Sequence, residues 1–220
     1  MSILPDNQVK QLLAERSLII DPFFPKFLGP NTYYCHLGNK FLLPKEGIER
    51  FDPLTMESKD IYEEVETNKP IVIRSQMFLL AETFEFLGIN DRHVIKLMNS
   101  SSLARCGVSH AAVGMVNAGC GMEKPVKLTL ELINNAPFDV VLTPTVIDTN
   151  GKIAWGTEVL KIAIQTMHSK PDCSYDNWKY AAYNNDQRPS GSKMKGRFDA
   201  KSSEYPPKDS LLAITNSKLK

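Results

Sequence analysis

The sequence lacks any long apolar run. No segment of its 220 residues approaches the roughly 20 consecutive apolar residues that a transmembrane helix needs. The N-terminal residues also lack the order of a signal peptide, in which basic residues precede an apolar stretch. We therefore expect a cytoplasmic protein that does not have a membrane as a partner.

Cysteine is scarce, and the residues that hold zinc in other proteins have the wrong spacing here. The four cysteines, Cys35, Cys106, Cys120 and Cys173, form no C-x-x-C pair. Because no export signal accompanies them, reduced thiols are expected. The H-x-E and P-C-x-x-C motifs of the zinc deaminases are absent, and the four histidines show no ligand spacing. The sequence predicts no metal held by protein side chains.

An excess of charge of one sign is missing as well. The chain has 26 Lys and Arg residues against 25 Asp and Glu residues, a net charge of +1. Such a balance gives no general attraction for nucleic acid or for an anionic membrane. We expect no nucleic-acid partner, and any anion site must be local.

What the sequence does contain is a succession of short apolar segments separated by turn signals. From residue 70 to residue 167 they recur at about ten-residue spacing, which favours a barrel or a sandwich over a βαβ fold. Before them, Asp6 or Asn7 is expected to cap a short helix with Val9, Leu12 and Leu13 on one face. Strands are expected at residues 17–20, 32–43, 71–73, 78–87, 94–98, 126–134, 138–143, 147–155 and 159–167.

Two of these strand segments are expected to contain turns. One lies at Gly38-Asn39, and the other at Thr149-Asn150-Gly151, where Asn-Gly is a hairpin signal. Residues 44–69 show no clear period and are expected to form a surface excursion. Because all-β units of this size are often single, we expect one β domain at residues 1–195 and a polar C-terminal tail at residues 196–220.

Residues 100–134 combine several groups suited to binding a ligand. They begin with three serines and an arginine, continue through a glycine-punctuated hairpin and end in an alternating strand. On that strand Glu131 shares its parity with Lys127 and Thr129, while the leucines point the other way. The pattern indicates a site for a polar, phosphorylated ligand. The alternatives are that Glu131 is a solvent-facing strand residue and that Arg105 forms a surface ion pair.

Several segments in collinear order between residues 1 and 193 form a more specific pattern. They are residues 3–6 (ILPD), 18–23 (LIIDPF), 30–31 (PN), 37–39 (LGN), 78–85 (FLLAETFE), 101–107 (SSLARCG), 129–134 (TLELIN) and 161–163 (KIA). Together they resemble the dCTP deaminases, which share the trimeric dUTPase fold.

The resemblance implies a fold, an assembly and a reaction. The fold is mainly β, a distorted β-barrel of the trimeric dUTPase-like type with a short N-terminal helix and a C-terminal arm. The assembly is a homotrimer with active sites between subunits. The reaction is zinc-independent deamination of dCTP to dUTP and ammonia, in which Glu131 works with an ordered water while Arg105 and Ser101 hold the glutamate, the water and the nucleotide. The nucleotide triphosphate carries Mg²⁺.

The resemblance also implies a set of nucleotide-binding residues in the serine turn, the hairpin and the C-terminal arm. These are Ser100, Ser102, Ala112, Val113, Gly114, Asn117, Tyr175, Lys179, Tyr183 and Gln187. The hairpin residues 112–114 read the base with backbone groups. The chemistry agrees with elementary acid–base reasoning, because one carboxylate can take a proton from water and return one to the leaving amine if burial raises its pKa.

Five positions depart from the family pattern, one of them near Tyr34, where the aspartate usual after Pro30-Asn31 is replaced. Ser100 stands where an arginine usually meets the triphosphate, and Asn117 where the trimeric dUTPases keep their catalytic aspartate. Ala182 and Asp186 stand where the family places a phosphate-binding lysine and glutamine. Four nearby side chains are candidates to replace these contacts: Lys179, Gln187, Arg188 and Lys193.

The departures leave two other functions open. The first is a divergent relative that is inactive or that takes another nucleotide, with fewer phosphates or a modified base. The second, less favoured, is a dUTPase-type diphosphatase, because the Asn117 amide cannot accept a proton as a general base. The same residue disfavours a bifunctional enzyme. Trp155 is expected either to pack within its hairpin or to line the site.

Overall fold

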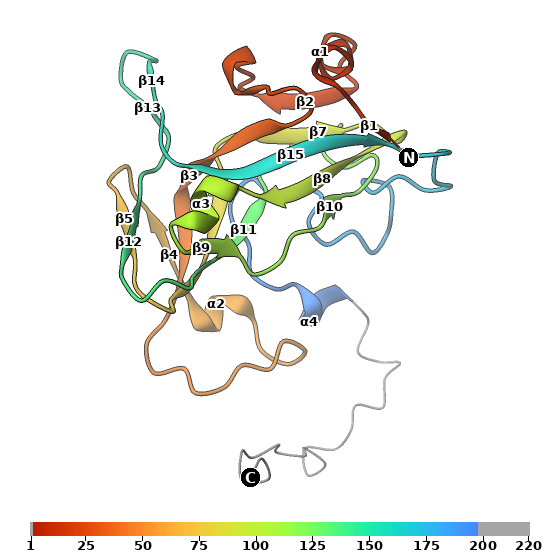
Figure 1. The fold of residues 1–220 in the computed structure, drawn as a ribbon. Helices are drawn as coiled ribbons and strands as arrows, with labels where there is room; N and C mark the ends of the chain where they lie inside the picture. Colours follow the sequence, from red (N-terminus) through yellow and green to blue (C-terminus); the bar gives the residue numbers. More distant parts are fainter. Residues whose placement is uncertain (1, 198–220) are drawn as a thin grey trace, which may run out of the picture.

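The computed structural model describes residues 2–197, and its architecture is mainly β (Figure 1). Within these residues one nine-stranded sheet has the path β10-β8-β15-β3-β6-β11-β9, with β1 paired to β15 and β4 paired to β3. Its strands are β1 (Ser2–Ile3), β3 (Tyr33–Pro44), β4 (Tyr62–Glu66), β6 (Phe78–Thr83), β8 (His93–Asn99), β9 (Val108–His110), β10 (Met115–Val116), β11 (Thr129–Asn134) and β15 (Glu158–Thr166).

The smaller elements lie around this sheet. The two-stranded sheets of the described residues are β2 (Leu18–Asp21) with β7 (Phe86–Ile89), β5 (Ile71–Ile73) with β12 (Val140–Leu142), and β13 (Val146–Ile147) with β14 (Ile153–Ala154). The helices are α1 (Asp6–Ala14), η1 (Pro25–Phe27), α2 (Ser58–Ile61), α3 (Ser101–Arg105) and α4 (Met194–Arg197). No helix within residues 2–197 is long and apolar enough to cross a bilayer.

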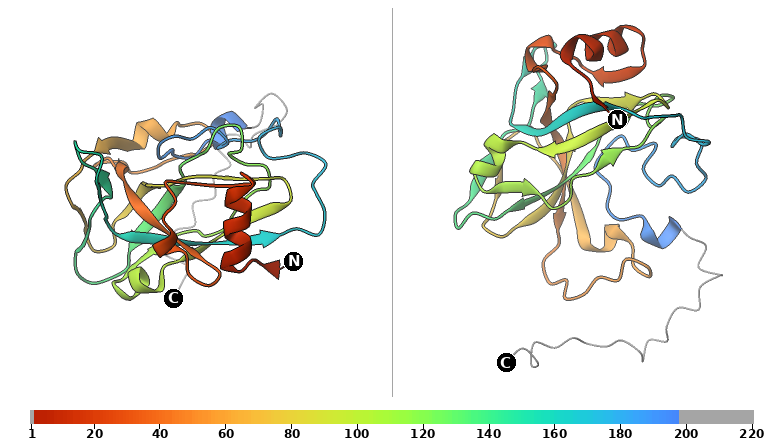
Figure 2. Two further views of the ribbon diagram at one scale, coloured as in Figure 1. Left: turned by 90° about the horizontal axis from the view of Figure 1, so that it is seen from above. Right: turned by 45° about the vertical axis from the view of Figure 1, so that its right-hand side comes forward.

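Strand β3 joins the two halves of the large sheet. Its first residues pair with β15, and its later residues pair with β6 and β4. The pairing with β6 shifts register between Leu37 and Phe41, and irregular pairing of this kind bends and twists a sheet. The sheet therefore curls around its own core, as two further views show (Figure 2). The expected mainly β, distorted-barrel fold is confirmed.

The turn expected at Gly38-Asn39 is wrong, because β3 runs through both residues. Glycine is required at position 38 for a different reason, the close approach of two strands. A Cβ atom at this position would lie 2.6 Å from Cγ of Glu82 on β6, so only glycine allows the two strands to approach this closely.

The strand expected at residues 78–87 is interrupted, and a buried carboxylate explains the break. Glu85 lies between β6 and β7 and is fully buried. Its Oε2 atom accepts a hydrogen bond from the His36 backbone N–H at 2.9 Å, and its Oε1 atom lies 2.8 Å from Nδ1 of the same histidine. The bend at residues 84–85 brings the Glu85 carboxyl to His36, and buried polar groups require partners of this kind.

Two N-terminal expectations also need correction. The N-cap of α1 is Pro5, which makes no side-chain capping bond. Asp6 instead pairs with Lys10 at 2.6 Å, while Asn7 Oδ1 accepts from the Gln8 N–H. Residues 44–69 lie at the surface as expected, with none of them buried, but they are not irregular throughout. They contain α2 and β4, and α2 begins with a reciprocal capping box between Glu57 and Asp60.

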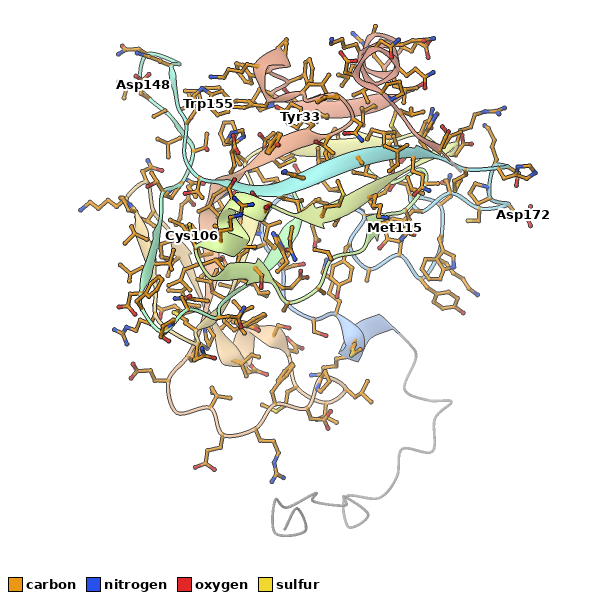
Figure 3. All side chains as sticks on the ribbon, in the orientation of Figure 1. Tyr33, Cys106, Met115, Asp148, Trp155 and Asp172 are labelled. Carbon is orange, nitrogen blue, oxygen red and sulfur yellow. The ribbon has the colours of Figure 1, made fainter. Side chains whose placement is uncertain are left out.

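Trp155 follows β14 and packs among aromatic rings. Its ring centroid lies 4.6 Å from those of both Phe24 and Phe27 and 4.8 Å from that of His36. Trp155 therefore packs against residues outside its hairpin rather than within it as expected, and Figure 3 labels it at the base of the projecting β13–β14 hairpin. The predicted tail at residues 196–220 lies almost wholly outside the described residues, so the domain boundary at residue 195 stays a prediction.

Candidate active site

A cavity of about 500 Å³ opens beside β11, and Glu131 lies on its wall. Its volume falls within the range of small-molecule sites. The wall is built from β11 and the segment before it, from residues of β4, β6 and β8, from residues 115–117 and residue 120, and from residues of the C-terminal arm between 175 and 192. The cavity therefore requires the arm to be folded against the sheet.

The alternation of β11 places Glu131 in this cavity. Leu130 and Leu132 are fully buried on the opposite face, whereas Glu131 is half-buried. The strand is held on both sides, by β6 and by β9, and the Glu131 carbonyl accepts the Ala111 N–H at 2.7 Å. Burial raises the pKa of the Glu131 carboxyl, and the residue's own backbone N–H lowers it by a smaller amount. A carboxylate in this state is suited to exchange protons with a ligand.

The serine turn lies elsewhere on the same chain. Ser101, Ser102 and Arg105 form α3, are exposed, and do not line the cavity. Figure 3 shows the separation, with Cys106 marking the end of α3 and Met115 marking the cavity wall. Within one chain, the structure does not bring Ser101 and Arg105 together with Glu131.

Ser100 has a local structural role. It is the N-cap of α3, and its Oγ accepts the Leu103 N–H at 3.5 Å. The residue is 1% exposed, so its hydroxyl is directed into the turn rather than toward solvent. Ser100 therefore caps α3 and does not line the cavity, contrary to its expected contact with the nucleotide within the same chain.

Residues 112–114, expected in a hairpin, connect β9 to β10, but these strands pair with β11 and β8 rather than with each other, and residues 112–114 do not line the cavity. Ala112, Val113 and Gly114 are exposed and leave most of their backbone groups at the surface, although the Gly114 carbonyl accepts the Leu97 N–H at 2.9 Å. Asn117 follows them, is exposed, and does line the cavity.

The predicted residues of the C-terminal arm divide into two groups. Tyr175 and Tyr183 line the cavity, and the Tyr175 hydroxyl accepts the Tyr183 N–H at 3.4 Å. Gln187 does not line it, because its amide donates to the Pro125 carbonyl at 2.6 Å. Lys179 lies at a second, more open cavity of about 710 Å³ and places its ammonium over the Tyr180 ring.

Backbone hydrogen bonds fasten the arm over Glu131. The Lys127 N–H donates to the Asp186 carbonyl, and the Ser190 N–H donates to Thr129 Oγ1, both at 3.0 Å. Further along, Ser58 Oγ of α2 donates to the Ser192 carbonyl at 2.8 Å. The arm thus follows β11 and ends against α2.

The charged arm residues near the cavity are already paired within the chain. The Asp186 carboxylate accepts hydrogen bonds from Lys193 Nζ and from Ser190 Oγ. Arg188 pairs with Glu64 at 3.4 Å on the surface. Lys193 therefore offsets the negative charge of Asp186, and both Lys193 and Arg188 form ion pairs within the chain.

Sequence reasoning assigned no role to two residues of this region. Lys127 lines the cavity, and its Nζ lies 2.7 Å from Oε1 of the buried Glu82. The signal for Lys127 was its shared parity with Glu131. Cys120 also lines the cavity, and burial raises the pKa of its thiol to about 12, so it stays protonated and packs as an apolar group.

Residues 2–197 contain no group of three or more His, Cys, Asp or Glu side chains arranged to hold a metal ion. This concerns side-chain clusters only and does not bear on a cation carried by a ligand.

Comparisons with known proteins agree with the residue pattern. A protein called dCTP deaminase, dUMP-forming, from Dictyoglomus turgidum is 32% identical over 206 residues, covering 90% of this chain and 98% of its own length. A protein of the same description from Methanosphaera stadtmanae is 30% identical over 206 residues, covering 90% and 97%.

A solved structure shows the same fold. The 2′-deoxycytidine 5′-triphosphate deaminase from Agrobacterium tumefaciens matches 76% of this chain with a TM-score of 0.55 and 17% identity. The match spans 48% of that chain, so about half of its length has a counterpart here.

The family model described as dCTP deaminase-like matches residues 3–147, which include α3, the hairpin and β11 with Glu131. The resemblance first seen in short segments thus extends over most of the sequence, and the chain belongs to the dCTP deaminase-like family.

Proposed function

We propose that this protein deaminates dCTP by hydrolysis and that Glu131 activates the water. The observation that carries the proposal is the half-buried Glu131 carboxyl, whose pKa is raised, on the wall of a 500 Å³ cavity. The deaminase names of the relatives support the same reaction class.

The reaction balances with one carboxylate. Glu131 takes a proton from water as the water oxygen bonds to C4 of the cytosine ring, and N3 of the ring takes up that proton as the C4=N3 double bond becomes single. Glu131 then moves the remaining hydroxyl proton to the exocyclic amine, the C4–N bond breaks, and ammonia leaves as C4 becomes the carbonyl of uracil. A carboxyl whose pKa lies nearer to neutral than usual is better matched to both transfers than a fully solvated one.

The remaining parts of the site come from a second chain of a homotrimer. Ser101 and Arg105 are exposed on α3, at a distance from their own chain's cavity, which supports their use by a neighbouring subunit. There Arg105 orients the carboxylate and Ser101 holds the water and nucleotide. The exposed backbone of residues 112–114 reads the base, and Mg²⁺ is bound by the phosphates of the substrate.

We propose dUTP as the product. Asn117 cannot act as a general base, and the other carboxylate of the cavity, Asp186, is held by Lys193 and Ser190. Release of dUMP is the second candidate, because the two similar relatives are described as dUMP-forming.

One set of assays tests the reaction and its product. The purified protein is incubated with Mg²⁺ and dCTP, dCMP, CTP or dUTP, and ammonia and pyrophosphate are measured. We expect ammonia from dCTP without pyrophosphate, and loss of at least about 100-fold in rate in Glu131→Gln. Ammonia together with pyrophosphate would favour dUMP formation. Pyrophosphate from dUTP with no ammonia from any cytosine nucleotide would refute the proposal.

A further inference from the structure

Lys127 is the cationic side chain of the Glu131 cavity. Of the described residues that line this cavity, it alone is a lysine, arginine or histidine. It lies four residues before Glu131 with the same parity. Four residues of extended chain span about 13 Å, which is comparable with the reach from a base to its phosphates in a nucleotide.

The ammonium group of Lys127 is only partly satisfied. It has three N–H donors, and within residues 2–197 its hydrogen-bond partner is Glu82 Oε1, at 2.7 Å. The Nζ atom of Lys127 also lies 5.2 Å from the centroid of the Phe86 ring. The lysine side chain keeps 12% of its surface exposed, whereas that of Glu82 is fully buried. The free donors are therefore available on the cavity side of the pair.

The partner is also incompletely satisfied. Glu82 Oε2 has no hydrogen-bond partner among the described residues. Burial raises the pKa of the Glu82 carboxyl, and Lys127 opposes that effect. A buried ion pair with unmet hydrogen bonds contributes little to stability, because the Coulomb attraction between the two charges is hardly larger than the cost of removing them from water. An anionic acceptor on the cavity side would satisfy the free donors of Lys127, although it would leave Glu82 Oε2 unpaired.

Several positions where the family is expected to bind phosphate supply no free cation in this chain. The position expected to hold a triphosphate-binding arginine is Ser100, a buried helix cap. Ala182 carries no charge, and Lys193 is paired with Asp186. The Lys127 N–H itself contacts the Asp186 carbonyl, so this lysine lies where β11 meets the arm.

We propose that Lys127 binds a phosphate group of the nucleotide, in place of the lost contacts, and that Glu82 positions its ammonium. This assignment rests on the proposed function, since it takes a nucleotide as the ligand. It makes Lys127 the residue by which this cavity prefers nucleotides over nucleosides.

The test measures binding rather than turnover. Calorimetry in the Glu131→Gln background compares dCTP with deoxycytidine, which has the same base and sugar but no phosphate. Lys127→Met removes the ammonium, and Lys127→Met with Glu82→Leu removes the whole pair and leaves no buried charge. Lys170→Met is the matched control, because Lys170 is also a lysine paired with a carboxylate, Asp91 at 2.7 Å, but outside the cavity.

We expect both cavity variants to bind dCTP about 10- to 100-fold more weakly, as loss of a charge-assisted hydrogen bond predicts, with deoxycytidine binding unchanged. The control keeps both affinities. If the folded double variant binds dCTP within about twofold of the parent, the Lys127–Glu82 pair is structural only and the inference is overturned. If the parent binds neither ligand, the proposed function fails as well, so the two failures are distinguishable.

Discussion

Glu131 is a carboxylate that the fold makes costly to ionise. The side chain projects from a strand whose other face is core, and burial raises its pKa. Under the proposed function, Glu131 lowers stability in exchange for reactivity, a trade found often at active sites.

This trade predicts a pH-dependent gain of stability in Glu131→Gln. The folded state binds the Glu131 proton more tightly than the unfolded chain does. The stability that this group contributes is therefore present at low pH and is lost as pH rises through the folded-state pKa. Glutamine has no such loss, so we expect the variant to melt at a higher temperature than the parent at pH 7 and at nearly the same temperature at pH 4.

Calorimetric melting across this pH range checks the expectation. Glu46→Gln, at an exposed position, is the control and should change the melting temperature little at either pH. A Glu131→Gln variant that is less stable than the parent at pH 7 would show that the carboxylate forms stabilising contacts instead.

Among the elements, the C-terminal arm depends on a close contact with α2. A Cβ atom at Gly191 would lie 2.2 Å from Ser58 Cβ and 2.4 Å from its Oγ. Real structures do not tolerate such distances, so a side chain here must push the arm away from α2 and loosen the cavity wall that residues 190–192 form.

Gly191→Ala is expected to cost about 1–3 kcal/mol of unfolding free energy through overpacking and to raise the KM for dCTP. Adding Ser58→Gly removes the opposing Cβ and should restore most of the loss. Urea unfolding and steady-state kinetics measure the two effects. Gly29→Ala is the control, because its nearest neighbour would be 3.5 Å away, an ordinary contact. Equal changes of unfolding free energy and KM in Gly191→Ala and Gly29→Ala would contradict the close contact between Gly191 and Ser58.

The elements differ in how far the sequence predicts them. The alternation around Leu130 and Leu132 predicted β11 and the face of Glu131, because side-chain parity is a local property of strands. The break between β6 and β7 was not predictable, since it depends on Glu85 reaching His36, 49 residues away. The unbroken course of β3 through Gly38 depends likewise on the distant Glu82.

The site was predictable in type but only partly in arrangement. Glu131, Tyr175 and Tyr183 lie at one cavity, as the resemblance implied. Gln187 binds the Pro125 carbonyl, and Lys193 pairs with Asp186. Both contacts depend on how the arm folds back over the strand, and no local sequence pattern encodes such a long-range contact. For the same reason the sequence predicted the face of the strand on which Lys127 lies, but neither its partner Glu82 nor a role for it.

At the scale of the whole molecule, the separation of α3 from the cavity makes the assembly testable. If each site takes Glu131 from one chain and Arg105 from the next, two inactive variants complement each other. In a trimer that mixes Arg105→Ala and Glu131→Gln chains, one of three sites carries both intact residues.

Random mixing of equal amounts should therefore restore roughly one quarter of the parent activity, since three quarters of the trimers are mixed. Ammonia release from co-refolded variants measures this, and each variant refolded alone is the control. Sedimentation should give the mass of three 24.7 kDa chains. No recovery in verified mixed trimers would place Arg105 and Glu131 in the same chain's site.

The way the arm follows β11 also affects the newly made chain. Glu131 is synthesised roughly 60 residues before Ser192, an interval of about 3–12 s at ordinary ribosomal rates. During that time the residues of β11 have been synthesised, but the part of the cavity wall supplied by residues between 175 and 192 is incomplete. Under the proposed function, a growing or prematurely ended chain therefore has Glu131 without its full cavity, and nucleotide binding becomes possible only late in translation.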